Sequence, residues 1–295
     1  MMRGTTLIEV CGLSHSYFSG TPLEVRSLRD VNFEVYENET LGIVGPTGSG
    51  KSTVLFHLNG LLRPQNGEVL VMGVPLSDRE ADMKEVRRQV GLVFQNPEDQ
   101  LFEQFAGDDV AFGPRNAGLS REQVRERVRA ALDIVGLPFS FKDRPCTGLS
   151  LGEKRRIALA GVFATEPRVL VLDEPTASLD PAGRRDLIEL LLRWRAVEGR
   201  SMIVVSHSME DIALLADRTL VLDDGCVVYS GTTGELFANR STLRAHRLQP
   251  PISLQVLYDL EDRGVHLRQG PSGMVPLHPH EIADAIGGML RDQGN

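Results

Sequence analysis

The chain has 295 residues, of which 32 are Lys or Arg and 40 are Asp or Glu, giving a formal net charge of −8. This length allows one large domain with an appendage, or two modest domains. The acidic balance argues against a general nucleic-acid binder, which is typically basic overall or on one face. We therefore expect no nucleic-acid partner.

Cysteine usage and hydrophobicity predict a cytoplasmic location. Cys11, Cys146 and Cys226 are scattered, which fits free thiols in a reducing compartment better than a disulfide framework. The first residues lack the long apolar core of a secretory signal. Apolar runs such as 169–172 are far shorter than the ~20 residues of a membrane-spanning helix. We therefore expect any role at a membrane to depend on a partner.

The N-terminal part of the chain is predicted to be rich in strands. Loose apolar–polar alternation or short apolar runs indicate strands over 7–18, 28–39, 40–45, 67–73 and 90–94. A glycine-rich turn joins the strand over 40–45 to a segment with a helical pattern over 51–62. This strand–turn–helix order is the context in which phosphate-binding loops occur.

Helix signals dominate from about Asp108. Ser120 is the expected N-cap of a helix, Gln123 stands at the capping-box position, and Gly136 is the expected C-terminal stop. Apolar residues recur at helical spacing between these signals. The segment therefore predicts a helical insert within an α/β chain.

An α/β pattern returns after the insert. Buried strands are predicted over 168–175 and 201–207, and Asp180 with Pro181 opens the helix between them as N-cap and first-turn residue. The last predicted strands form a hairpin that turns at Asp224 and Gly225.

The segment GPTGSGKST matches the phosphate-loop pattern G-x-x-x-x-G-K-[ST]. Backbone N–H groups of such a loop converge on phosphate oxygens at the positive end of a helix. We expect Lys51 to contact the outer phosphates of ATP and the Ser52 hydroxyl to ligate Mg²⁺. The predicted nucleotide-binding residues of the loop are Gly45, Pro46, Thr47, Gly48, Ser49, Gly50, Lys51, Ser52 and Thr53.

Two acidic residues, Asp173 and Glu174, end an apolar strand. At the carboxyl edge of a parallel sheet they would face the phosphates. We expect Asp173 to hold Mg²⁺, directly or through water, and Glu174 to act as the catalytic group that accepts a proton from the attacking water or orients it. His207 follows the next strand and is expected to hydrogen-bond the γ-phosphate and that water. A solvated turn and a surface histidine are the alternatives when these motifs are taken alone.

These motifs stand in a fixed order: GPTGSGKST, Gln95 in VGLVFQNPEDQ, LSLGEKRR, VLVLDEP, SLD and SH. Over roughly residues 5–238 this order resembles an ABC-transporter ATPase subunit. The resemblance implies an α/β fold of the P-loop NTPase type, with a RecA-like core, an antiparallel β subdomain and a helical subdomain inserted at about 96–165. It implies an ABC ATPase domain over 1–239 and a small C-terminal α+β appendage over 240–295, through which such ATPases dimerise.

The resemblance also implies a dimer in which each ATP lies between the phosphate loop of one chain and the segment Ser150, Gly152 and Glu153 of the other. Tyr17 matches the aromatic residue that stacks on adenine, with a packed strand tyrosine as the alternative. Gln95 matches a catalytic-site residue that senses Mg²⁺ and water, and Asp180 matches an aspartate of the dimer interface.

The segment LSLGEKRR departs from the family's usual Leu-Ser-Gly-Gly-Gln at Leu151 and Glu153. Ser150 and Glu153 form a capping-box pattern, which would order the start of a helix. A carboxylate suits a helix N-terminus but repels nearby phosphate. We expect this repulsion to be offset by Lys154, Arg155 and Arg156.

A narrower resemblance is to the energy-coupling-factor class, ATPases that drive import of vitamins or of cobalt and nickel. It rests on the segment 97–100, on DVAFGP and on KRRIALAGV. It implies that residues near 95–105 meet transmembrane transporter subunits at the cytoplasmic face of the cell membrane. We expect Glu98 and Asp99 to complement arginines of that partner, with an ordinary solvated loop as the alternative.

Several alternatives stay open. The second ATPase subunit is either an identical chain or a sibling, and the cargo is cobalt, nickel or a vitamin, with the metals slightly favoured. ATPases that act on DNA or ribosomes share the motif order, but the chain lacks their long coiled coils and second phosphate loop. His278 and His280 suggest a metal sensor, yet an H-x-H pair without further ligands is more consistent with a surface segment.

Overall fold

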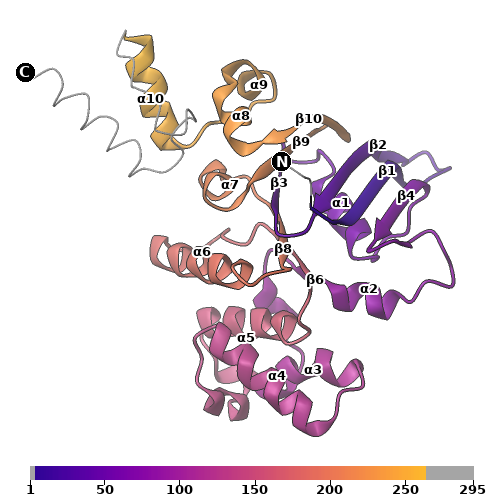
Figure 1. Ribbon diagram of the computed structural model, residues 1–295, viewed down its shortest axis with the longest axis vertical. Coiled ribbons are helices and arrows are strands. Elements are labelled where there is room, and N and C mark those ends of the chain that lie inside the picture. Colours follow the sequence, from indigo (N-terminus) through magenta and orange to yellow (C-terminus); the bar gives the residue numbers. More distant parts are fainter. Residues whose placement is uncertain (1–3, 264–295) are drawn as a thin grey trace, which may run out of the picture.

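The computed structural model describes residues 4–263 and contains two β-sheets with helices around them (Figure 1). The first sheet is antiparallel, with the order β2-β1-β4-β5. Its strands are β1 (Thr6–Tyr17), β2 (Val25–Tyr36), β4 (Asn66–Val71) and β5 (Val74–Pro75).

The second sheet has six strands in the order β10-β9-β3-β8-β7-β6. The five strands from β9 to β6 are parallel, and β10 pairs with β9 in the antiparallel sense. The strands are β3 (Thr40–Val44), β6 (Val90–Val93), β7 (Val169–Asp173), β8 (Ser201–Val205), β9 (Arg218–Asp223) and β10 (Cys226–Thr232). Because parallel strands end at the same edge, the segments that follow β3, β7 and β8 meet there.

Alternation of side chains along β7 divides the hydrophobic core. Leu170 and Leu172 lie on one face of the sheet, where they pack in a cluster with residues of the surrounding helices, among them Ile157. Val169 and Val171 pack in a second cluster with the antiparallel sheet on the opposite face. Since successive side chains of a strand point to opposite faces, a continuous apolar run is the pattern required of a strand buried on both sides.

The helices cover the sheets and extend from both ends of the molecule. Figure 1 shows α3, α4 and α5 at one end and α8, α9 and α10 at the other. No helix within residues 4–263 is long and apolar enough to cross a membrane. The helices are α1 (Lys51–Leu58), α2 (Met83–Gln89), α3 (Ala106–Asn116), α4 (Arg121–Ile134), α5 (Leu151–Phe163), α6 (Pro181–Arg195), α7 (Met209–Leu215), α8 (Thr233–Ala238), α9 (Arg240–Ala245) and α10 (Ile252–Asp262), with short 3-10 turns η1 (Pro97–Gln100), η2 (Phe139–Asp143) and η3 (Cys146–Gly148).

Two predicted elements differ from the observed ones by at least three residues at one end. The helix expected over 51–62 ends at Leu58, because Gly60 adopts a left-handed conformation with φ +68° that ends the helix. The strand expected over 28–39 is displaced toward the N-terminus and ends at Tyr36, since Asn38 turns the chain with φ +61°. The predicted hairpin turn has the two positive φ values that its type requires, 45° at Asp224 and 76° at Gly225.

The described part of the predicted appendage shares a core with the rest of the chain. Leu243, Leu254 and Leu257 are buried in one cluster with Val44 of β3 and Ile212 of α7. Segment 240–263 is thereby anchored close to the strand that leads into the phosphate loop. His278 and His280 lie outside the described residues, and the domain boundary at 239 stays a prediction.

The N-terminus of α4 offers a test of local stability. The Ser120 side chain accepts the Gln123 N–H at 3.3 Å, and the Gln123 side chain accepts the Ser120 N–H at 2.9 Å. Ser120→Ala should lower the free energy of unfolding by about 1 kcal/mol in urea titration, because the Gln123 N–H loses its side-chain acceptor. Ser120→Asp, which keeps an acceptor, is the control, and an equal loss in both variants would contradict the role of the cap.

Candidate nucleotide-binding site

A cleft of about 520 Å³ opens at the carboxyl edge of the parallel strands. It brings together segments that are far apart in the sequence, and most of the residues predicted for the site line it. The lining residues are Ser27, Thr47, Gly48, Gly50, Lys51, Ser52, Thr53, Gln95, Asp173, Glu174, Ala177 and His207. Ser27 and Ala177 were not predicted, because neither belongs to a residue pattern that indicates nucleotide binding.

The phosphate loop is held tightly against its neighbours. A Cβ at Gly45, where φ is +152°, would lie 1.9 Å from the Leu222 carbonyl oxygen. At Gly50, where φ is +100°, it would lie 2.6 Å from the Ser27 carbonyl oxygen. Only glycine permits both the conformation and the close approach. The loop therefore curves onto β9 and β2 before α1 begins at Lys51.

Lys51 lies inside the curve of the loop. Its side-chain Nζ donates hydrogen bonds to the carbonyls of Gly45 at 2.8 Å and Pro46 at 2.9 Å, and the residue is 7% exposed. Burial lowers the pKa of the Lys51 ammonium, and the nearby Glu174 and Asp173 carboxylates oppose that shift. The buried hydroxyl of Ser49 has no hydrogen-bond partner among the described residues. A buried cation, an unused hydroxyl and a helix N-terminus suit the phosphates of a nucleotide.

Ser52 and Asp173 supply adjacent oxygen ligands. The Ser52 hydroxyl donates to the Asp173 carboxylate at 3.3 Å. Burial raises the pKa of the Asp173 carboxyl, whereas Ser52 and Lys51 lower it. A hydroxyl beside a half-buried carboxylate is the oxygen donor set that Mg²⁺ prefers. The residues present therefore fit a magnesium ion at this point of the cleft.

Glu174 and His207 form the wall opposite the phosphate loop. The His207 backbone N–H donates to Glu174 Oε2 at 3.1 Å, and its Nε2 lies 3.3 Å from Glu174 Oε1. The Glu174 N–H donates to the Val205 carbonyl at 2.9 Å, and the residue has the unusual φ of +48°. Burial raises the pKa of the Glu174 carboxyl. A strained, partly buried carboxylate at a sheet edge is typical of a functional group.

Tyr17 touches the phosphate loop but does not line the cleft. Its hydroxyl shares a hydrogen bond with the Thr53 hydroxyl at 3.2 Å, and its ring packs edge-on against His15 at 4.7 Å. The Ser27 hydroxyl reaches the same Thr53 oxygen at 2.8 Å. These contacts tie β1 and β2 to the start of α1. Whether the Tyr17 ring stacks on adenine stays a prediction.

The remaining predicted nucleotide residues stand apart from the cleft. Ser150 is the N-cap of α5 and forms a capping box with Glu153, accepting its N–H at 3.3 Å and donating its own N–H to the carboxylate at 2.8 Å. Asp180 caps α6 by accepting the Gly183 N–H at 2.9 Å. None of the segment 150–153 lines the cleft of its own chain.

The expectation for the basic run after Glu153 is wrong in part. Glu153 pairs with Arg144 at 3.1 Å, and the pKa of its carboxyl is lowered mainly by the Ser150 N–H. Arg156 turns to Asp186, with a 3.4 Å ion pair. Arg155 turns inward and does not approach Glu153, because its guanidinium is used elsewhere.

The expectation that Glu98 complements arginines of a transmembrane partner is also wrong. Its carboxylate is 9% exposed and lies 3.0 Å from Arg155 Nε. A carboxylate buried against its own chain's arginine cannot complement an arginine of a partner. Asp99, in contrast, is exposed.

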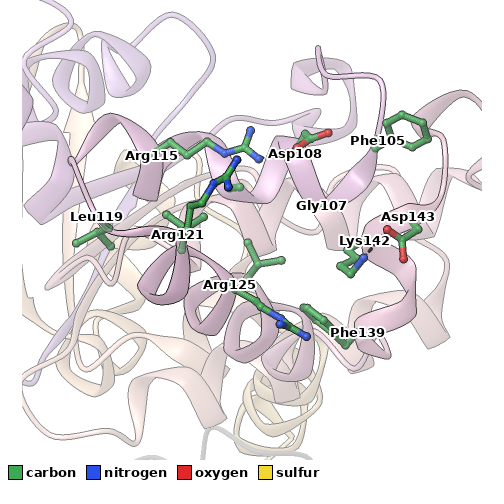
Figure 2. Close-up of a pocket in the computed structure, with 13 residues that line it drawn as sticks. Phe105, Gly107, Asp108, Arg115, Leu119, Arg121, Arg125, Phe139, Lys142 and Asp143 are labelled. Atoms are coloured by element: carbon green, nitrogen blue, oxygen red, sulfur yellow. Dashed lines mark hydrogen bonds and ion pairs between the residues drawn. The ribbon is translucent and has the colours of Figure 1, made fainter.

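A larger cleft, of about 730 Å³, lies among α3, α4 and η2 (Figure 2). It shares no lining residue with the nucleotide cleft. Figure 2 shows Arg115 beside Asp108, to which it is ion-paired at 2.7 Å, and Phe139 on the opposite wall. The cleft therefore belongs to the helical end of the molecule and has no part in the chemistry at the phosphate loop.

Asp173, the half-buried acid at the end of β7, should lower the stability of the nucleotide-free protein at neutral pH. Because the pKa of Asp173 is raised in the folded chain, ionisation at neutral pH opposes folding, and stability is lost as pH rises through that pKa. Asp173→Asn should raise the melting temperature of the nucleotide-free protein, by about 2–4 °C for each kcal/mol of relieved cost, and weaken the Mg²⁺ dependence of nucleotide binding. Thermal melts from pH 4 to 8 test this, and a lower melting temperature at pH 7 would contradict it.

Comparison with known proteins places this geometry in a family. The family model described as ABC transporter matches residues 28–177. The energy-coupling factor transporter ATP-binding protein EcfA2 of Symbiobacterium thermophilum is 52% identical over 278 residues, 94% of each chain. The protein of the same name from Clostridium perfringens is 42% identical over 263 residues, 89% of this chain and 92% of its own.

Solved structures agree with the sequence matches. The cbiO1 protein of Clostridium perfringens, described as part of the ABC transporter complex cbiONQ, is 34% identical with a TM-score of 0.72, over 86% of this chain and 99% of its own. A dimeric ATP-binding cassette, MJ0796, bound to ADP and Pi, is 28% identical with a TM-score of 0.68, over 77% of this chain and 98% of its own. These matches confirm the predicted α/β fold of the P-loop NTPase type. The chain therefore belongs to the ABC transporter ATPases and, within them, to the ATP-binding proteins of energy-coupling factor transporters, which hydrolyse ATP to drive transport.

Proposed function

We propose that this chain binds ATP and Mg²⁺ in the cleft of about 520 Å³ and energises a membrane importer, with cobalt or nickel as the cargo and a vitamin as the alternative. The observation that carries ATP hydrolysis is the meeting of Lys51, Ser52, Asp173, Glu174 and His207 in one cleft. The names of the relatives support the transporter class. Isolation of the intact membrane complex and identification of its bound solute would test the cargo.

The chain's own groups account for the chemistry. Lys51 and the loop N–H groups bind the outer phosphates. Ser52, Asp173 and Gln95 line the same cleft and would hold a Mg²⁺ ion, which would neutralise the phosphate charge. Glu174 accepts a proton from the attacking water or orients that water. The His207 imidazole, 51% exposed, lies beside the Glu174 carboxylate in the same cleft. Fixed groups on two adjacent strands need little rearrangement during the reaction.

The site is proposed to be completed by a second ATPase subunit. Ser150 and Gly152 belong to no part of their own chain's cleft, and Leu151 between them is 67% exposed. A dimer would place this exposed turn over the nucleotide of the other subunit, and the dimeric state of the MJ0796 cassette supports that arrangement. ATP would then favour the closed dimer, because only that state supplies contacts from both chains. An identical chain and a sibling chain both suit this role.

The transmembrane partner is proposed to dock at the helical end, at the cytoplasmic face of the membrane. Phe102, within the predicted contact segment 95–105, is 63% exposed and packs edge-on against Phe112, which is 45% exposed, at 4.7 Å. Exposed aromatic rings side by side are typical of an interface. Phe105 of the same segment is 36% exposed and lines the cleft of Figure 2.

The role of Glu174 is tested by Glu174→Gln. The amide keeps the size of the side chain but cannot accept a proton, so ATP binding should persist while turnover falls about 10²–10⁴-fold. Turnover by the parent should fall as pH drops through the raised pKa of Glu174, since only the carboxylate accepts a proton. Steady-state kinetics with a binding titration measure both, with Glu122→Gln on the exposed face of α4 as control. Turnover at the parent rate would remove Glu174 from its role.

The departure at Glu153 is tested by Glu153→Gln. Its carboxylate is bound to the Ser150 N–H and to exposed Arg144, and exposed contacts of this kind contribute little. We expect an active parent and a change in ATP affinity of less than about tenfold, or ~1.4 kcal/mol. An inactive parent that Glu153→Gln restores would show instead that the carboxylate repels the nucleotide.

A further inference from the structure

A buried ion pair joins α5, whose N-cap is Ser150, to the segment that follows Gln95. Arg155 Nε lies 3.0 Å from Glu98 Oε2, and the two side chains are 8% and 9% exposed. Arg155 Nη2 also donates to Glu98 Oε1 and to the Gln95 carbonyl, both at 3.4 Å. One guanidinium thus contacts both the turn η1 and Gln95, which lies two residues before that turn begins.

The two ends of this contact belong to different parts of the proposed function. Gln95 lines the nucleotide cleft of its own chain, and η1 lies in the segment proposed to meet the transmembrane subunits. Arg155 is the fifth residue of α5, whose N-cap is Ser150. Because a helix moves as a rigid body, a displacement of Arg155 also displaces Ser150 and Gly152.

A second, backbone connection runs parallel to the ion pair. The Cys146 N–H donates to the Gln104 carbonyl at 2.9 Å, and the Ala106 N–H donates to the Arg144 carbonyl at 3.0 Å. Arg144 in turn is ion-paired with Glu153 in the first turn of α5. These contacts hold the end of segment 95–105 near Gln104, and the Arg155–Glu98 pair holds the end near Gln95.

We propose that the Arg155–Glu98 ion pair transmits movement of segment 95–100 to Ser150 and Gly152, the residues proposed to cover the nucleotide of the second ATPase subunit. The two residues thereby act as positioning residues. The inference rests on the proposed function, because it assumes that transmembrane subunits move this segment. Neither residue lines the nucleotide cleft of its own chain. The forked guanidinium bonds fix direction as well as distance, which an apolar contact would not do.

The test uses the assembled transporter, with ATP turnover measured with and without the transmembrane subunits. Glu98→Gln and Arg155→Met should keep the ATP affinity of the ATPase within about twofold and lower the stimulation by the transmembrane subunits at least about tenfold, that is by ~1.4 kcal/mol. The exchanged pair E98R with R155E should restore part of the stimulation. Arg156→Gln is the matched control, since Arg156 is the next residue of α5 and its ion pair with Asp186 is 41% and 64% exposed.

Removal of one buried partner leaves an uncompensated charge, so a single variant can fail to fold. The double variant E98L with R155M removes both charges and should keep the melting temperature while losing stimulation. Full stimulation in this double variant, or an equal loss in Arg156→Gln, would overturn the inference. A parent complex whose ATPase the transmembrane subunits do not stimulate would contradict the proposed function as well, whereas a stimulated parent with insensitive variants contradicts the inference alone.

Discussion

The close approach of the phosphate loop to β9 is the constraint on which the rest of the site depends. At Gly45 a side chain would meet the Leu222 carbonyl at 1.9 Å, so the loop is pressed onto the strand beside it. That contact sets where α1 begins and turns the Lys51 ammonium into the curve of the loop. The parallel partners of β3 then determine which residues face it. Because β8 and β7 follow β3 in the sheet, Glu174 and His207 end opposite the loop.

Charge buried at this edge is costly and therefore informative. Burial lowers the pKa of Lys51 and raises those of Asp173 and Glu174, so each group is held in an environment that opposes its ionised form. The Lys51 ammonium stabilises both ionised carboxylates, whereas the carboxylates of Asp173 and Glu174 repel each other. The phosphates of a nucleotide and a bound Mg²⁺ would compensate the charges of these side chains. This explains why the chain has ionisable groups here instead of an apolar edge.

The ion pair of Arg155 and Glu98 is a second buried charged contact, and it lies outside the nucleotide cleft. Sequence patterns assigned both residues to surface roles, one near the phosphate and the other on a docking face. The structure places them against each other at 8% and 9% exposure. No local pattern predicts that outcome, because the two residues are 57 positions apart and meet only when α5 packs on η1.

Local sequence patterns predicted most of the strands, several helices and most of the residues that line the nucleotide cleft. These predictions rest on local signals, which depend only on neighbouring residues along the chain. The signals are glycines at tight turns, acids at the end of an apolar strand, and the helix caps at Ser120, Ser150 and Asp180. The tertiary structure alone decided which side chains face each other. It admitted Ser27 to the cleft, held Tyr17 outside it and turned Arg155 inward, because these outcomes depend on strand order and helix packing between segments far apart in the sequence.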